Sequence, residues 1–345
     1  MAWSLLFLRV SSVDIIDVHA HVVPETFPAN PAPSAESRWP CMCHGDNHTA
    51  QVMISDKPFR AIDHRSWDGQ KRIEDMDAAG VVRQALSPMP ELLSYWYEPS
   101  IGLEMCKWMN HTIANMVADR PARFSGLGIV PLQDPALAAE YLTDIKNAGL
   151  NGIEIGSNIN KIVLGDERFE EFYAEANRLE LAIFVHALHP IGAERLAATP
   201  ELVPFSAFPL DTALSAMSLI RAGVPDRYPN LRFGFSHGGG AVVPLAHRLG
   251  KGAQVTDGFG GRISKAPVAY AKTFFYDNLV YDPGYAAYLA NEFAPGQVFC
   301  GTDYPYAIME SEPADFIQAC TLNDADSVRF SAATKFLTGS FDAIH

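Results

Sequence analysis

The sequence predicts an α/β fold, a (β/α)8 barrel of the TIM type with a lid insertion after strand 1. Eight short apolar runs, many of them β-branched, alternate with segments whose apolar residues recur at helical spacing. This alternation implies parallel strands joined by right-handed crossovers, and eight rounds favour a closed barrel over an open sheet. The 345 residues, of which 48% are hydrophobic, can bury one large core. We therefore expect a single catalytic domain over residues 1–345.

Each strand is expected at an apolar, β-branched run, and each helix at an amphipathic segment that follows such a run. The expected strands are 14–18, 81–87, 124–130, 152–156, 182–186, 231–236, 274–280 and 298–301. The expected helices are 71–79, 103–118, 135–148, 169–179, 212–222, 241–249, 284–292 and 314–319. Together they repeat the strand–helix unit around the barrel.

Two segments interrupt this alternation. Residues 24–69, rich in Pro, Asp, His and Ser, are too long for a simple βα loop, so we expect a lid or small insertion over the barrel mouth. Residues 187–210 form a second long loop on the same side. Both segments should border the active site.

Composition excludes several classes of protein. A formal charge of −14, from 26 basic and 40 acidic residues, argues against nucleic-acid binding but allows a small anionic substrate held by a few arginines. Five cysteines do not indicate a disulfide framework, so a reducing cytoplasm is expected. No stretch approaches the roughly 20 apolar residues of a membrane span. The apolar start of the chain is interpreted as an extra tail or early start codon rather than a signal peptide.

Ionisable residues lie where several predicted strands end. His19 and His21, at i and i+2 on strand one, project to the same face. His186, His237 and Asp303 follow strands five, six and eight, and strand C-terminal ends meet at one face of a barrel. A lone histidine at a strand end is usually structural, but five such residues from four strands favour a metal site. Three imidazoles and a carboxylate suit a borderline-soft ion such as zinc and leave His237 as a nearby base.

Other motifs have weaker interpretations. A superficially metal-like cluster consists of Cys41, Cys43, His44 and His48. Their irregular spacing in a loop-like segment argues against an independent zinc site. The run Gly238–Gly240 lacks the lysine of a P-loop and is interpreted as a tight turn that lets the backbone approach the site.

Two residues keep open alternatives. His189 either lines the pocket or is a plain loop histidine. Glu154, on the fourth strand, either faces the barrel interior near the metal or is a buried charge partnered elsewhere.

The chain resembles the metal-dependent amidohydrolase superfamily (amidohydrolase-related family 2) and, within it, the 2-amino-3-carboxymuconate-6-semialdehyde decarboxylase group. The resemblance runs from Asp14 to about Phe336. It rests on Asp17-Val-His19-Ala-His21, Phe59-Arg60, Trp67-Asp68, Arg72-Ile-x-x-Met76-Asp77, Gln84-Ala-Leu-Ser87, Ser94-Tyr95-Trp96, Phe184-Val-His186, Ser236-His237-Gly-Gly-Gly240 and Gly301-Thr-Asp303-Tyr-Pro305.

The resemblance implies a role for each of the five strand-end residues. His19, His21, His186 and Asp303 would bind Zn2+, with Mn2+ or another divalent ion as an alternative. His237 would be the catalytic base that activates the metal-bound water and returns a proton to carbon as CO2 leaves.

It also implies two arginines that bind substrate carboxylates through paired hydrogen bonds. The first is Arg60. The second, Arg248, would reach across a homodimer interface into the neighbouring site. Without the resemblance, Arg60 would be interpreted as an exposed lid charge and Arg248 as a surface helix residue.

The sequence departs from the family where substrate choice is expected. It has Ala187-Leu188-His189-Pro190 where the decarboxylase has Pro-Trp-Asp-Met, Pro204 where a pocket tryptophan is expected, and Tyr306 where the family has phenylalanine. The predicted function is a zinc-dependent, non-oxidative decarboxylase of a small unsaturated or aromatic carboxylic acid. The alternatives are a metal-dependent hydrolase of a lactone, an amide or a ring-cleavage product, and a metal-binding protein without turnover.

Overall fold

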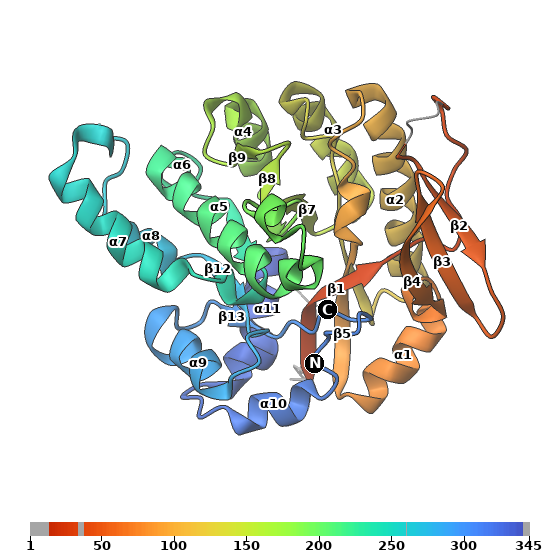
Figure 1. Cartoon of the computed structure of the whole chain (residues 1–345). Coiled ribbons are helices and arrows are strands. Elements are labelled where there is room, and N and C mark those ends of the chain that lie inside the picture. The colour runs from red at the N-terminus through yellow and green to blue at the C-terminus, as the bar shows by residue number, and fades with distance from the viewer. Residues whose placement is uncertain (1–13, 34–37, 260, 341–345) are drawn as a thin grey trace, which may run out of the picture.

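The computed structural model describes residues 14–33, 38–259 and 261–340. Its centre is a sheet of eight parallel strands in the order β1-β5-β6-β7-β10-β11-β12-β13 (Figure 1). These strands are β1 (Ile15–Val22), β5 (Val81–Pro88), β6 (Phe124–Gly128), β7 (Gly152–Gly156), β10 (Ala182–His186), β11 (Arg232–Phe235), β12 (Phe275–Asp277) and β13 (Val298–Phe299). All eight strands expected from the sequence are therefore present. The expectation about the N-terminal tail concerns residues outside the described part of the chain.

The last strand returns to the first and nearly closes the sheet into a barrel. Val18 N donates to Cys300 O at 2.9 Å, and isolated bridges join Asp17 to Cys300 and Ala20 to Tyr304. These contacts lie just beyond β13, so the C-terminal ends of the first and last strands are held side by side. The predicted (β/α)8 barrel is confirmed.

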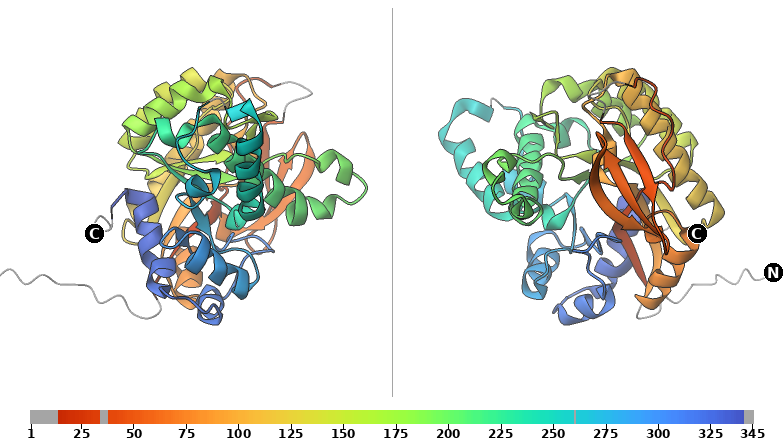
Figure 2. Two further views of the ribbon diagram at one scale, coloured as in Figure 1. Left: turned by 90° about the vertical axis from the view of Figure 1, so that its left-hand side faces the viewer. Right: turned by 45° about the vertical axis from the view of Figure 1, so that its right-hand side comes forward.

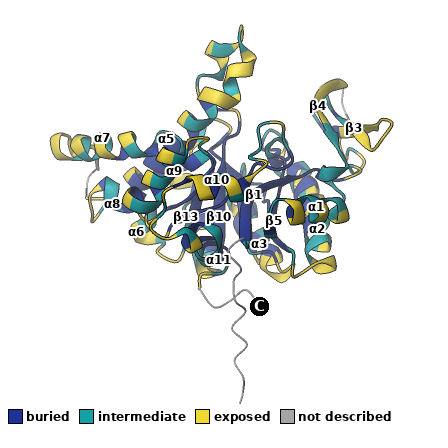
Figure 3. Ribbon diagram, turned by 90° about the horizontal axis from the view of Figure 1, so that it is seen from below, coloured by how far each residue is buried: buried dark blue, intermediate teal, exposed yellow. Residues whose placement is uncertain are grey.

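Helices surround the barrel, with buried faces toward the strands and exposed faces outward (Figure 3). They are α1 (Gly69–Ala78), α2 (Pro99–Asp119), α3 (Pro135–Asn147), α4 (Glu170–Arg178), α5 (Phe208–Ala222), α6 (Val224–Arg227), α7 (Val242–Val255), α8 (Pro267–Ala271), α9 (Pro283–Tyr288), α10 (Pro313–Ala319) and α11 (Ala332–Thr338). The sequence analysis missed α6, α8 and α11. Each is at most two turns long, too short to establish a helical period.

Helix α11 seals the end of the barrel opposite the histidines. Its Phe336 lies 5.2 Å from the Phe299 ring and 5.4 Å from the Phe275 ring, in an apolar cluster that also contains Ile16 and Val18. Ile16 and Val18 precede the histidines of β1, and the strand register shifts between Asp17 and Ala20. The apolar residues thus fill the N-terminal half of the barrel, and the polar side chains of the candidate site lie at its C-terminal end.

The insertion at 24–69 folds into a small antiparallel sheet beside the barrel (Figures 1 and 2). Its strands are β2 (Pro40–His44), β3 (Thr49–Ile54) and β4 (Lys57–Asp63). Residues Phe59 and Arg60 of β4 line the large cavity at the barrel mouth, as do Leu188 and Phe205 of the loop after β10. The expectation that both long segments border one cavity is confirmed.

One helical run reaches the length and apolar composition of a membrane span. Within the described residues, Pro200–Ala222 is long and apolar enough to cross a membrane by length and composition, although half of its most apolar window is buried in the protein. The prolines of this segment suggested breaks, yet successive helical turns continue through them into α5. The apolar side chains of α5, including Leu219 and Ile220, belong to the core.

Candidate metal centre and active site

Four buried side chains meet at the C-terminal end of the barrel. His19 and His21 lie in β1, His186 is the last residue of β10, and Asp303 follows β13. One potential ligand atom from each residue lies within 4.8 Å of all the others. The four predicted ligands are therefore brought together, from three strands that are separate in the sequence.

Each of the three histidines is oriented through its Nδ1 atom. An acceptor at Nδ1 fixes the proton on that nitrogen, so the lone pair lies on Nε2. Residue alternation along β1 turns both of its imidazoles to the barrel interior. The acceptors are Asp277 Oδ2 for His19 at 2.7 Å, Pro88 O for His21 at 2.9 Å and Ala187 O for His186 at 2.9 Å.

The donor set fits a divalent cation. Nε2 of His19 and Nε2 of His21 lie 3.2 Å apart, and two facing lone pairs repel unless a positive charge lies between them. Oδ1 of Asp303 lies 3.1 Å from Nε2 of His21 and 3.7 Å from Nε2 of His19. This oxygen is buried without a hydrogen bond, which a bound cation would compensate. Three imidazoles and one carboxylate are typical ligands of zinc and related ions.

The electrostatics of the cluster keep Asp303 ionised and shift the pKa values of the three histidines in different directions. Burial lowers the pKa of His21 and, more strongly, that of His186. Burial also acts to lower the pKa of His19, but its hydrogen bond to Asp277 and the charge of Asp303 outweigh this effect and raise the pKa to about 9. For Asp303, burial opposes ionisation, yet the adjacent imidazole of His21 and the charges of His19 and His237 lower its pKa. The imidazoles of His21 and His186 are thus neutral, as metal ligands must be, whereas a cation bound at His19 would displace a proton from its Nε2.

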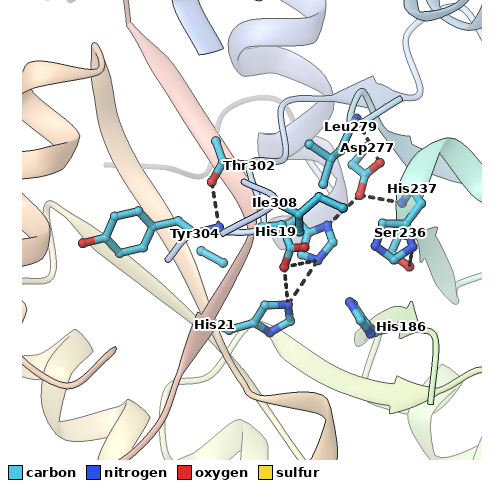
Figure 4. Close-up of polar contacts among 12 residues, drawn as sticks. His19, His21, His186, Ser236, His237, Asp277, Leu279, Thr302, Tyr304 and Ile308 are labelled. Carbon is cyan, nitrogen blue, oxygen red and sulfur yellow. Dashed lines mark hydrogen bonds and ion pairs between the residues drawn. The ribbon is translucent and has the colours of Figure 1, made fainter. Parts of the chain in front are cut away.

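Asp277, at the end of β12, connects the candidate ligands to His237. Its Oδ2 accepts from His19 Nδ1 at 2.7 Å and from His237 N at 2.9 Å (Figure 4). Its Oδ1 accepts from Gly238 N at 2.7 Å and from Leu279 N at 3.1 Å. The sequence analysis missed this residue. A carboxylate inside the apolar run expected as the seventh strand, 274–280, was the signal that could have revealed it.

His237 lies two residues beyond the end of β11, and its ring faces the metal cluster. The ring centroid lies 5.4 Å from that of His19 and 5.2 Å from that of His186. Its backbone has φ of +56°, a conformation that non-glycine residues rarely adopt outside functional sites. Burial, together with the charge of His19, lowers the pKa of His237 to about 4. The imidazole is therefore neutral at neutral pH and can accept a proton.

The glycine run after His237 forms the expected tight turn. Gly238, Gly239 and Gly240 all have positive φ. A Cβ atom on Gly240 would lie 1.9 Å from Pro209 O, and one on Gly238 would lie 2.4 Å from a methyl group of Val280. Only glycine lets the backbone approach Asp277 and α5 this closely.

A cavity of about 1130 Å³ opens above the cluster. Arg60 lines it, with its guanidinium 4.3 Å from the centroid of the Tyr306 ring, which stacks on His21 at 5.1 Å. Within the described chain Arg60 forms no ion pair, so its charge is available to a ligand. The apolar lining includes Phe59, Met89, Leu188, Phe205, Phe208 and Ile308, and the polar lining includes Glu91, His186, His189, His237 and Asp303.

Arg248 is not brought to this cavity. It lies on the exposed side of α7, outside the cavity lining. His189 does line the cavity. Glu154 is fully buried on β7, and neither of its carboxylate oxygens has a hydrogen-bond partner, but it does not belong to the ligand group.

The motif around Cys41 and Cys43 forms no second metal cluster among the residues that the structure describes. Both thiols are free and exposed.

A buried network supports the backbone of β1. Arg72 donates to Gln84 Oε1 at 2.6 Å and also to the carbonyl of His21. Gln84 donates to Asp17 at 2.9 Å, and Asp17 accepts from His19 N at 3.1 Å. These residues belong to the motifs recognised in the sequence, but their role becomes visible only when α1, β5 and β1 are adjacent.

Comparison with known proteins agrees with this geometry. The chain is 32% identical over 308 residues to a 2-amino-3-carboxymuconate-6-semialdehyde decarboxylase of Dictyostelium discoideum, which covers 88% of this chain and 85% of that protein. The structure of 5-carboxyvanillate decarboxylase from Sphingomonas paucimobilis matches with a TM-score of 0.78 and 24% identity, covering 94% of this chain and 99% of that chain.

A dihydroxybenzoic acid decarboxylase from Polaromonas sp. JS666, solved with bound manganese and the inhibitor 2-nitroresorcinol, matches with a TM-score of 0.71. It is 20% identical and covers 94% of this chain and 96% of that chain. The named relatives support a carboxy-lyase. The amidohydrolase family itself matches residues 16–334, and the chain therefore belongs to the amidohydrolase family.

Proposed function

We propose that this protein is a metal-dependent, non-oxidative decarboxylase of a small unsaturated or aromatic carboxylic acid. The observation that carries the proposal is the convergence of four buried ligand atoms within 4.8 Å, at the mouth of a cavity that also contains His237 and Arg60. The decarboxylases among the relatives favour carbon–carbon cleavage over hydrolysis on this scaffold.

We propose zinc as the ion, because three of the four donors are imidazoles, with manganese as the alternative. His19, His21, His186 and Asp303 would hold it. A divalent ion bound there would act as a Lewis acid toward an oxygen of the substrate. Asp277 fixes the orientation of His19 through Nδ1, which makes Nε2 the ligand atom and increases its basicity.

Arg60 and His237 perform the remaining steps. Arg60 can hold a carboxylate by two parallel hydrogen bonds, which uncharged analogues cannot form. Loss of CO2 breaks the bond between the carboxyl and the adjacent carbon and leaves the electron pair on that carbon. His237, neutral at rest, takes a proton from solvent at its ring and transfers it to the carbon. One carboxylate and one proton thus give CO2 and the protonated product.

Replacing His237 tests this assignment. In His237→Ala we expect CO2 release to fall by roughly 10²–10⁴-fold, the usual contribution of a general acid–base residue, while metal content by elemental analysis stays near that of the wild type. His111→Ala, which removes an exposed histidine of α2, is the matched control and should keep full activity. Near-normal turnover in His237→Ala would refute the role of His237.

We further propose that the protein acts as a homodimer in which Arg248 contacts the carboxylate in the neighbouring site. The exposed position of Arg248 on α7, without an ion pair among the described residues, is compatible with this role. Sedimentation would give the oligomeric state, and Arg248→Ala should raise KM for the acid without dissociating metal. A monomeric active enzyme would refute it. The five free cysteines lead us to propose a reducing cytoplasm as its location.

A further inference from the structure

The cavity wall contains a polar cluster that the proposed chemistry does not use. Nε2 of His189 lies 3.1 Å from Oε2 of Glu91, and Oε1 of Glu91 accepts a hydrogen bond from Arg38. The guanidinium of Arg38 lies 3.9 Å from the centroid of the Trp96 ring. The cluster therefore connects three segments around the cavity: the insertion, the loop after β5 and the loop after β10.

His189 is held in one orientation although its side chain is 46% exposed. Its backbone has φ of +44°, an uncommon conformation for a residue with a side chain. Its ring lies 5.2 Å from the Trp96 ring at an interplanar angle of 33°. Glu91, by contrast, has only 10% of its side chain exposed. A nearly buried carboxylate and an aromatic surface thus fix an imidazole that reaches the cavity.

Nδ1 is the ring nitrogen of His189 that does not contact Glu91. Among the described residues, Nδ1 of His189 has no hydrogen-bond partner. The carboxylate of Glu91 is also paired with Arg38. When Nε2 of a neutral imidazole donates its proton to such a carboxylate, Nδ1 carries the lone pair that can accept a hydrogen bond.

The cavity that His189 lines is largely apolar. Its wall also includes Met89, Leu188, Phe205 and Phe208. A hydrogen-bonding group in an apolar wall discriminates against ligands that leave it unpaired. His189 also lies in the tetrapeptide 187–190, where the sequence departs from the family motif.

We propose that His189 is a specificity-determining residue that accepts a hydrogen bond from a hydroxyl or amino substituent of the acid, and that Glu91 positions it. The inference rests on the proposed function only in taking a small unsaturated or aromatic acid as the ligand of this cavity. It predicts that the substrate carries a hydrogen-bond donor in addition to its carboxylate.

Binding of matched acids tests this without requiring turnover. The probes are benzoate and the three monohydroxybenzoates, titrated into the zinc-loaded protein by calorimetry. For the wild type we expect at least one hydroxybenzoate to bind about tenfold more tightly than benzoate, the effect of one good hydrogen bond. In His189→Ala this ratio should fall to within about twofold of one, with benzoate affinity unchanged. His247→Ala, which removes an exposed histidine of α7 outside the cavity, should keep the ratio.

Variants of Glu91 separate positioning from stability. The amide oxygen in Glu91→Gln can still accept from Nε2 of His189, so the preference should survive, whereas Glu91→Leu should abolish it. If His189→Ala does not fold, His189→Asn replaces it, because asparagine tolerates positive φ and is too short to reach Glu91.

The outcomes of this experiment distinguish failure of the proposed role of His189 from failure of the proposed function. No preference for any hydroxybenzoate in the wild type, or an unchanged ratio in His189→Ala, would overturn the role of His189. A preference that depends on His189, without CO2 from any acid, would support that role and refute the decarboxylase. CO2 release with an unchanged ratio would refute the role of His189 alone.

Discussion

At the scale of single residues, Asp277 is the group whose chemistry most affects the candidate metal site. Its Oδ2 accepts from Nδ1 of His19 at 2.7 Å, and an amide oxygen is a weaker acceptor than a carboxylate. In Asp277→Asn we expect the affinity for zinc to fall by roughly 10–100-fold, the usual effect of losing the partner of a metal-binding histidine. Competition with a chelator of known affinity measures this change.

The matched control is Asp326→Asn. Asp326 forms an exposed ion pair with Arg329, and its side chain is 72% exposed, so the same chemical change should leave zinc affinity unaltered. Equal affinities for the wild type and Asp277→Asn would show that Asp277 does not support a metal ligand.

The sequence was sufficient to predict which candidate metal ligands lie together, but not all of the residues that bond to them. His19 and His21 were predictable because a strand has a period of two, and His186 and Asp303 because strand ends meet in a barrel. Asp277 was missed because its partners lie on β1 and after β11, and these relations exist only in three dimensions. The partner expected for Arg248 belongs to another copy of the chain.

At the scale of elements, the turn after β11 holds His237 against Asp277. In Gly240→Ala the new methyl group would lie 1.9 Å from Pro209 O, at a backbone φ of +57°. We expect a loss of about 3 kcal/mol or more in the free energy of unfolding, from steric overlap and backbone strain together. Urea denaturation monitored by circular dichroism gives this value.

Gly252→Ala is the matched control, because this glycine lies inside α7 and a Cβ there would meet nothing within 4 Å. Alanine should stabilise the helix at this position by about 0.5–1 kcal/mol. Equal stabilities for Gly240→Ala and the wild type would contradict the close approach of the turn to α5.

The cluster of Glu91 with Arg38 and His189 makes stability depend on pH. Burial acts to raise the pKa of Glu91, but the hydrogen bond from His189, together with the charge and hydrogen bond of Arg38, outweighs it and lowers this pKa. A carboxyl whose pKa is lower in the folded protein stabilises the fold above its ordinary pKa of 4.5, and this contribution is lost as pH falls through the folded value.

We therefore expect the wild type to exceed Glu91→Gln by roughly 1 kcal/mol in free energy of unfolding at neutral pH. This difference should shrink as pH falls below 4.5. Urea unfolding of both proteins across this range measures it, and a difference that grows on acidification would show that the sign is wrong.

Elements with a clear hydrophobic period were predictable, and the others were not. The barrel strands are buried on both faces, so they appear as continuous apolar runs. The strands of the insertion are partly exposed, with mixed polar sequences such as Pro40–His44, and lack this signal. The first part of the helical run at Pro200–Ala222 was missed because it contains prolines, and the sequence analysis expected a helix only over 212–222.

At the scale of the whole molecule, the residues that stabilise the barrel and the residues of the candidate site lie at opposite ends. Phe336 and the apolar residues around it fill the N-terminal end, while the candidate ligands lie at the other end on strands that are far apart in the sequence. The fold could be predicted because the number and order of strands are local properties of the sequence. The shape of the cavity could not, since it depends on how the insertion and the loop after β10 meet.

The central claim is that the cluster of His19, His21, His186 and Asp303 binds a metal that this protein needs for decarboxylation. The most direct measurement is a zinc titration of chelator-treated protein, with CO2 release and product mass followed for a panel of aminocarboxymuconate-like and hydroxybenzoate-like acids. We predict that activity rises with zinc and saturates near one ion per chain, with one CO2 lost per product formed. CO2 release that does not depend on metal, or a zinc-dependent product that has gained water instead of losing CO2, would contradict the account.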